Sequence, residues 1–219
     1  MTSPWEITPE TEGIFAIWKP SGISSYSAIY RVKKITGKTK VGHAGTLDPL
    51  AEGILVVAVG RESTKKLFSS ELKEKEYIAT IELGAASSTD DAEGEIKTIP
   101  HPPRPSQEEI ENCLQQFIGK TMQRPPVWSA LKINGTRAYQ KARRGETFEM
   151  KERPAEIFSI ELIRYGWPEV EIKVVTGPGV YVRSLARDIG EKLKTGGYLK
   201  KLIRTRVGSY TKKEALRLP

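Results

Sequence analysis

The sequence predicts an α+β fold in which helices pack on a mixed, largely antiparallel sheet. Predicted strands outnumber predicted helices, and the two do not alternate strictly as they would in a parallel α/β fold. The 219 residues are 38% hydrophobic and 28% charged, which is enough apolar material for a buried core. We therefore expect residues 1–219 to form one domain.

The first half of the chain predicts three strands. Apolar or alternating runs bounded by turn residues mark them at 13–19, 54–59 and 77–83. The second run is apolar at every position, which is typical of a strand buried on both faces. A helix is expected at 62–72, between the second and third strands.

Another helix is expected between the first two strands. Ser24 or Ser25 can cap its N-terminus, and Gly37 ends it just after Thr36. This helix has four large apolar residues at helical spacing, which are Tyr26, Ile29, Val32 and Ile35. They predict the face that packs on the sheet.

The second half of the chain continues with a capped helix. Ser106 and Glu109 form a capping-box pattern ahead of Ile110, Leu114 and Phe117. The other expected elements are a solvated acidic turn at 86–95, a short helix at 138–144, strands at 155–163 and 170–175, a helix at 181–194, a strand at 202–208 and a short helical tail.

Basic residues exceed acidic ones and are clustered along the chain. Lys and Arg number 35 against 27 Asp and Glu, a net charge of +8. Residues 183–213 hold ten basic and two acidic residues, and residues 31–40 hold five basic residues and none that is acidic. A third cluster consists of Lys132, Arg137, Lys141, Arg143 and Arg144. Three separate clusters indicate contacts with the phosphates of a nucleic acid.

The composition also indicates the setting in which the protein works. No apolar run approaches the roughly 20 residues of a membrane helix, and the acidic N-terminus is unlike a signal peptide. The single cysteine, Cys113, excludes an internal disulfide. We expect a cytoplasmic monomer that does not contact membranes. With two His and one Cys, and without a Gly-rich phosphate-binding loop, we expect no metal and no cofactor.

The segment 41–53 carries the strongest chemical signal. It places His43 and Asp48 five positions apart in a turn-rich stretch, with Gly45 and Pro49 controlling the backbone around them. A fully apolar run follows at once. Such a loop on a rigid scaffold is typical of a site that holds a carboxylate in a fixed position.

Five stretches of the sequence resemble the pseudouridine synthases of the TruB type. They are KPSGISS at 19–25, GHAGTLDP at 42–49, KEY at 75–77, RPPVWSALKING at 124–135 and GVYVRSL at 179–185. The resemblance covers about residues 13–208. It implies the pseudouridine synthase fold with an inserted thumb loop at about 120–152, and isomerisation of uridine 55 in the TΨC arm of tRNA. The family's C-terminal PUA domain is expected to be absent.

The resemblance implies roles for six residues. Asp48 matches the catalytic aspartate, Tyr77 the aromatic that stacks on the target base and is placed to help proton transfer, and Arg183 the arginine that pairs with the aspartate. The residues that match substrate-binding positions are His43, Tyr181 and Leu202.

The reaction makes sense of these residue types. To turn an N-glycoside into a C-glycoside, the base must be detached, rotated and rejoined through C5. A carboxylate can act as the nucleophile or as the base that removes a sugar proton, and both routes stay open. Both need Asp48 ionised, which a neighbouring Arg183 favours. Stacking on Tyr77 offsets part of the stacking lost when the base flips out, about 1–3 kcal/mol per base.

Three alternatives stay open. A synthase of the same family acting on another RNA site would carry the same residues. A non-catalytic RNA-binding or RNA-folding protein would have the same basic clusters, but it gives no reason for an Asp–Arg pair. A glycoside hydrolase needs a second acid, for which Glu52 is the only candidate close in sequence, and it does not explain the positive charge.

Overall fold

The structure is a computed structural model that describes residues 6–67 and 72–218. The chain divides into two compact units. Unit 1 comprises Met1–Ile78 and Leu202–Pro219, and unit 2 comprises Ala79–Lys201. Two strands contribute residues to both units, namely β4 (Lys75–Leu83) and β12 (Gly197–Val207).

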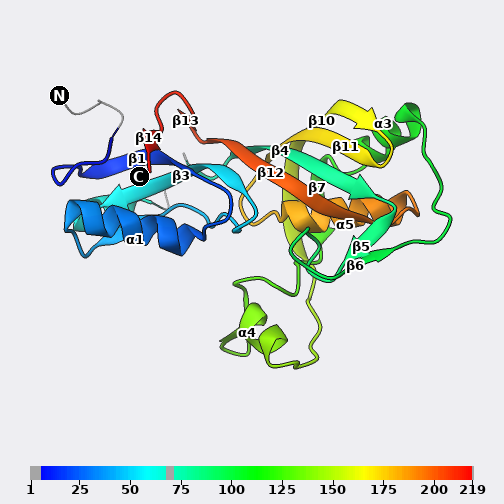
Figure 1. The fold of residues 1–219 in the computed structure, drawn as a ribbon, viewed down its shortest axis with the longest axis horizontal. Helices are drawn as coiled ribbons and strands as arrows, with labels where there is room; N and C mark the ends of the chain where they lie inside the picture. The colour runs from blue at the N-terminus through cyan, green and yellow to red at the C-terminus, as the bar shows by residue number, and fades with distance from the viewer. Residues whose placement is uncertain (1–5, 68–71, 219) are drawn as a thin grey trace. The chain divides into compact units, whose positions relative to one another are not determined.

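Unit 1 is built on strands with α1 along one side of them (Figure 1). Besides its parts of β4 and β12, its elements are β1 (Gly13–Lys19), α1 (Ser25–Thr36), β2 (Val41–His43), β3 (Glu52–Val59), α2 (Arg61–Lys66), β13 (Tyr210–Thr211) and β14 (Leu216–Arg217). The strands follow the order β14-β1-β3-β12-β4, and β2 and β13 pair with β3 and β12. Pairing is antiparallel between β1 and β3 but parallel between β3 and β12, so the sheet is mixed as expected.

The core of unit 1 lies around β3. Ile54, Val56 and Ala58 alternate on one face and pack with Leu67 and Val207. The intervening residues of β3 are buried as well, which agrees with a strand covered on both faces. The strand therefore offers a rigid base for the loop that precedes it.

Unit 2 is built on the strands that continue from β4 and β12. Its other elements are β5 (Ala85–Ser87), β6 (Ile96–Thr98), α3 (Gln107–Gln115), β7 (Gly119–Gln123), β8 (Lys132–Ile133), β9 (Thr136–Arg137), α4 (Ala138–Arg143), β10 (Arg153–Gly166), β11 (Glu169–Thr176) and α5 (Val182–Lys192). The strand order is β12-β4-β11-β10-β7, and β10 pairs antiparallel with both of its neighbours.

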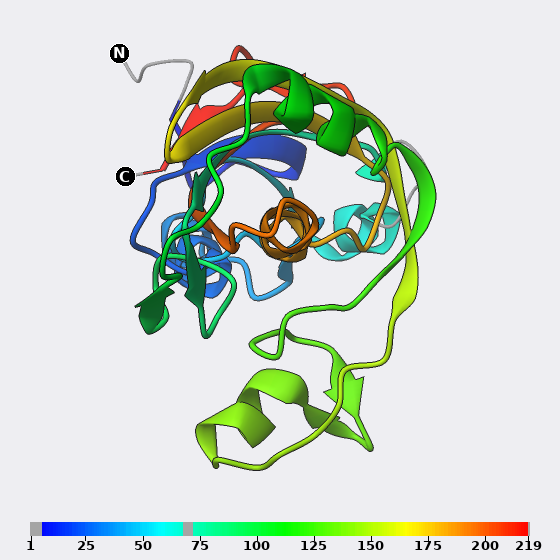
Figure 2. The ribbon, with the colours of Figure 1, turned by 90° about the vertical axis from the view of Figure 1, so that its right-hand side faces the viewer.

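Helices cover the strands of unit 2, and one segment leaves them. The helix α3 contacts β10 and α5, and its expected capping box at Ser106 and Glu109 is present. Between β7 and β10 the chain forms β8, β9 and α4, which Figure 2 shows reaching away from the strands of the unit. This segment carries the third basic cluster and lies within residues 120–152, where the insertion stays a prediction.

Three expectations about local structure need correction. The tail forms the strands β13 and β14 instead of a helix, because Leu216 pairs with Ile17 at the edge of the sheet. In α1, Tyr26 is 75% exposed instead of buried, since Ala28, Ile29 and Val32 form the inward face. The helix expected at 62–72 is α2, which ends at Lys66, and residues 68–71 of that prediction lie outside the described residues. None of the helices within 6–67 and 72–218 is both long and apolar enough to cross a membrane.

Candidate active site

The loop that carries Asp48 is clamped from α1 and the turn before it. The Ser25 hydroxyl donates to the Leu47 carbonyl at 2.9 Å and accepts from the Leu47 amide at 2.8 Å. The Gly22 amide donates to the Pro49 carbonyl at 2.8 Å. Both neighbours of Asp48 are therefore tied to a separate part of the chain. These hydrogen bonds to the backbone hold the half-buried Asp48 in one place.

A fully buried arginine of β12 supports the same loop. The Arg204 side chain donates to the Ile54 carbonyl at 2.7 Å, to the Gly45 carbonyl at 3.1 Å and to the Thr46 carbonyl at 3.4 Å. One carbonyl that accepts from Arg204 belongs to Gly45, whose backbone conformation favours glycine. Gly45 has φ +91°, and a Cβ there would lie 3.1 Å from the Cε of Lys75.

Arg204 also links the two residues expected to act on the base. Full burial lowers the pKa of Arg204, whereas the Tyr77 hydroxyl, its hydrogen-bond partner, and the charge of Asp48 oppose this shift. A guanidinium stays charged at neutral pH even so. Its charge therefore lies among Asp48, Tyr77 and the backbone of the loop that carries Asp48.

Two further basic groups lie near Arg204. Burial, with the charge of Arg204 as a second cause, lowers the pKa of Lys75 to about 8. Burial also lowers the pKa of His43; a hydrogen bond with the Gly45 backbone opposes this, and Arg204 adds to it. His43 is thus neutral at pH 7. Its Nδ1 is buried and has no hydrogen-bond partner in the described part of the chain.

The expected residues of unit 2 lie at the start of α5. The Arg183 guanidinium donates to the Thr89 carbonyl at 3.1 Å and to the Trp128 carbonyl at 3.0 Å. Its Nε lies 3.5 Å from Oδ2 of Asp91, and both side chains are buried. This corrects the expectation of a solvated acidic turn, because Asp91 balances a buried cation. The backbone of Tyr181 exchanges two hydrogen bonds with the Gln123 side chain, at 2.9 and 3.1 Å.

The structure thus gathers part of the predicted set. Asp48, Tyr77 and His43 all lie near Arg204 in unit 1. Leu202 is buried two residues before Arg204 on the same strand, so the two side chains share a face. Arg183 and Tyr181 belong to unit 2, and the pairing of Asp48 with Arg183 stays a prediction.

Sequence reasoning missed Arg204, Lys75 and Asp91. Arg204 fell within a window of ten basic residues and was interpreted only as part of a phosphate-binding cluster. One signal could have singled it out. It stands at alternate spacing with Leu202 in a strand, where an inward-facing arginine must have buried partners.

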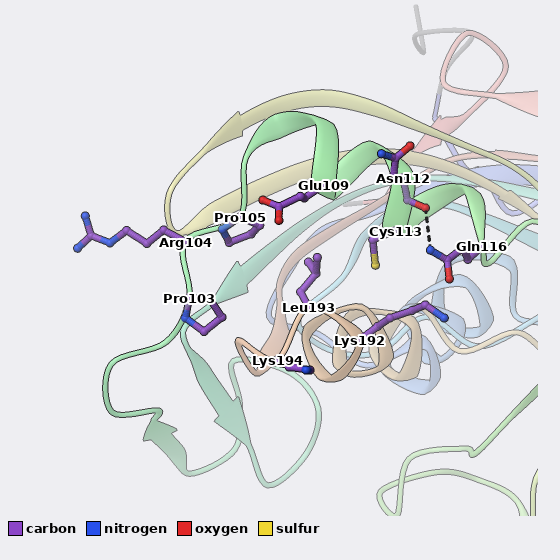
Figure 3. A pocket seen from close by; sticks show the side chains of 10 residues that line it. All are labelled: Pro103, Arg104, Pro105, Glu109, Asn112, Cys113, Gln116, Lys192, Leu193 and Lys194. Atoms are coloured by element: carbon purple, nitrogen blue, oxygen red, sulfur yellow. Dashed lines mark hydrogen bonds between the residues drawn. The ribbon is translucent and has the colours of Figure 1, made fainter.

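A groove of about 450 Å³ lies elsewhere in unit 2, between α3 and the end of α5 (Figure 3). Cys113, Lys192 and Leu193 are among its lining residues, and burial raises the pKa of the Cys113 thiol. The residues that line this groove include none of those predicted to act on a substrate.

Comparisons with known proteins identify the family of the chain. The model of the TruB family pseudouridylate synthase N-terminal domain matches residues 33–182, and that of the tRNA pseudouridylate synthase B C-terminal domain matches residues 183–218. The chain belongs to the TruB family of pseudouridylate synthases.

Individual relatives show how far the similarity extends. The tRNA pseudouridine synthase B of Phocaeicola vulgatus is 47% identical over 82% of this chain and 76% of its own length. The enzyme of that name from Bacteroides fragilis is 43% identical over 91% of this chain and 84% of its own length. The one from Prochlorococcus marinus is 41% identical over 94% of this chain and 66% of its own length. Among solved structures, a chain of a Cbf5–Nop10–Gar1 complex matches all of this chain with a TM-score of 0.72 and 27% identity. This chain spans 58% of its length.

Proposed function

We propose that this protein is a tRNA pseudouridine synthase that isomerises uridine 55 in the TΨC loop, with Asp48 as the catalytic carboxylate. Membership of the TruB family and relatives named tRNA pseudouridine synthase B support the reaction and the substrate. The observation that carries the proposal is local. Asp48 sits in a loop clamped on both sides, beside a buried arginine that also contacts Tyr77.

Each predicted residue has a separate role in the proposed isomerisation. The bond between N1 and C1′ breaks, a bond between C5 and C1′ forms, C5 loses its proton and N1 gains one. The Asp48 carboxylate serves as the nucleophile or as the base that removes a sugar proton, and either role needs an anion held at a fixed distance. Tyr77 stacks on the flipped base. We propose that Arg183 pairs with Asp48 and that Tyr181 and Leu202 line the pocket for the base.

His43 has a binding role in this scheme. It is neutral and lies near the loop that carries Asp48, and we propose that it supports the RNA loop that remains after the base has flipped. We propose that the segment around α4 is the thumb and grips the RNA with its basic residues. The enzyme is proposed to act as a cytoplasmic monomer formed by one catalytic domain.

The test measures release of tritium from C5 of uridine. A tRNA transcript carrying C5-tritiated uridine is incubated with the wild type and with Asp48→Asn. We expect the wild type to release tritium and the variant to lose turnover by at least about 10⁴-fold, because an amide can be neither nucleophile nor base. Filter binding should show tRNA affinity retained in the variant, since an anionic carboxylate contributes nothing to binding anionic phosphates.

Two results would contradict the proposal. One is turnover by Asp48→Asn at the wild-type rate. The other is free uracil accumulating with wild-type enzyme, which indicates hydrolysis instead of rejoining through C5. Mapping pseudouridine in the product tRNA checks the position, and a modified base outside the TΨC loop would favour another RNA site.

A further inference from the structure

The outer face of α1 presents aromatic rings to solvent. Tyr26 is 75% exposed and Tyr30 is 50% exposed. They stand four positions apart and so lie on one face of the helix, opposite Ala28, Ile29 and Val32. Single exposed apolar residues are common, but two adjacent rings on a helix form a surface. We call Tyr26, Tyr30 and Lys34, at i, i+4 and i+8, the α1 stripe.

The charged residues of α1 itself have one sign. The helix has no acidic residue, and residues 31–40 contain five basic ones. The Lys34 Nζ lies 5.6 Å from the centroid of the Tyr30 ring, so cation and ring form one continuous patch. Lys38 is held at 2.5 Å by Glu12 and is not counted in the patch.

The α1 stripe starts next to the loop that carries Asp48. Tyr26 directly follows Ser25, whose hydroxyl makes both hydrogen bonds to Leu47. From Tyr26 to Lys34 the helix advances by about 12 Å at 1.5 Å per residue. A strand of RNA whose target base enters beside Asp48 can therefore continue along the helix for about two nucleotides.

We propose that the α1 stripe binds unpaired nucleotides of the substrate RNA, with bases or riboses packed on the two tyrosines and a phosphate on Lys34. The proposal rests on the proposed function, since it assumes an RNA substrate. Alternating aromatic and basic groups suit an RNA strand, because rings stack on any base while cations track the backbone. A protein partner is disfavoured, because the stripe has no exposed aliphatic side chain and no acid to balance its charge.

The first experiment measures tRNA binding and turnover separately for Tyr26→Ser/Tyr30→Ser. We expect the Kd and the KM for tRNA to rise about tenfold, the value for loss of one stacked base, with kcat unchanged. Phe158→Ser is the matched control, because Phe158 is a 47% exposed aromatic of β10, in the other unit. It should leave all three quantities at wild-type values. A melting curve verifies that each variant is folded.

The second experiment separates contact from a structural effect. A photoreactive phenylalanine at position 26 should cross-link to tRNA. Lys34→Gln should reduce the slope of log Kd against log salt by about one, whereas Lys65→Gln, whose lysine pairs with Glu62 at 2.7 Å, should not.

The outcomes distinguish this surface from the proposed function. Two results would overturn the α1 stripe and leave the proposed synthase activity intact. One is a wild-type Kd and KM in the double tyrosine variant. The other is a cross-link to another protein in a lysate without a cross-link to tRNA. If wild-type enzyme releases no tritium, the proposed function fails, and unchanged tRNA binding by the tyrosine variants then overturns the stripe independently.

Discussion

At the scale of single residues, Arg204 explains how the loop that carries Asp48 keeps its shape. A buried cation is tolerated only with partners, and this one has three backbone carbonyls, the Tyr77 hydroxyl and the charge of Asp48. The guanidinium suits this task because its donors have a fixed planar geometry. Its role is to position other groups.

Replacing Arg204 should affect stability and kcat to different degrees. Arg204→Met leaves the buried Ile54 carbonyl without its donor, at a cost of about 1–3 kcal/mol. Arg204→Lys keeps the charge but cannot reach all partners, so we expect a folded enzyme whose kcat falls about 100-fold while its Kd for tRNA stays within a factor of two. Urea unfolding, single-turnover kinetics and filter binding check this. A wild-type kcat in a folded Arg204→Lys enzyme would show that the site does not depend on this geometry.

The titration of Lys75 gives a prediction about pH. Its pKa is about 8 in the folded protein against an ordinary value of 10.5. Below pH 8 both states carry the proton and the buried charge lowers the stability. Between about pH 8 and 10.5 the unfolded state binds the proton and the folded state does not, so stability rises with pH through this window.

The measurement compares variants at matched pH. Lys75→Met removes the buried charge. The free energy of unfolding of the variant should therefore exceed that of the wild type by most below pH 8, and this difference should shrink as the pH rises to 10.5. Lys73→Met, at an exposed neighbouring lysine, is the control and should show no such trend. A constant difference between Lys75→Met and wild type across this range would exclude the shifted titration.

At the scale of elements, three adjacent strands of unit 2 are joined by one lysine. The Lys200 Nζ on β12 lies 2.5 Å from Glu82 on β4 and 2.7 Å from Glu169 on β11. Hydrogen bonds with the two carboxylates raise the pKa of Lys200, and the bond from Lys200 lowers the pKa of Glu169. This stabilisation is present above about pH 4.5 and is lost as pH falls through the folded pKa of Glu169. At alkaline pH the same stabilisation is lost as the pH rises through the folded pKa of Lys200.

Charge reversal should separate Lys200 from Lys201. Lys200→Glu places three carboxylates together, so we expect a lower melting temperature with little change in the salt dependence of tRNA binding. Lys201 is exposed, so Lys201→Glu should leave the melting temperature within a degree and weaken tRNA binding. Melting curves and salt titrations compare the two. Equal effects of both reversals on tRNA affinity would assign Lys200 to the RNA-binding face.

The elements differ in how well local pattern predicts them. The helix α1 matches its prediction because Ser24 caps it and Gly37 takes the left-handed conformation after it, both of which are local effects. The prediction of a helical tail was wrong, because residues 212–217 favour a helix only when their pairing with β1 is ignored. Short strands such as β2 were missed because three residues carry too little periodicity.

At the scale of the whole molecule, the excess of basic residues predicts salt-sensitive binding. The cluster around α4 is the clearest test. Two of its basic residues, Lys141 and Arg144, pair with Glu146. The other three are Lys132, Arg137 and Arg143. Replacing these three with Gln should reduce the slope of log Kd against log salt by about two to three.

The matched control changes the same number of charges elsewhere. Lys65, Lys97 and Arg164 each pair with a carboxylate on the surface, so their triple replacement with Gln should leave the slope nearly unchanged. Salt titrations by filter binding measure both. Equal loss of slope in the two triple variants would indicate a general charge effect without a defined thumb contact.

The sequence by itself determined the fold class and the family and singled out Asp48 as the candidate carboxylate, because caps, periodicity and the 42–49 motif are properties of contiguous residues. Only the tertiary structure decided which groups neighbour that carboxylate. Arg204 lies 156 positions after Asp48, and Asp91 is buried against Arg183 although its stretch is polar. The reason is that pairing between distant strands sets burial, and burial decides whether a charged side chain faces water or must find a partner.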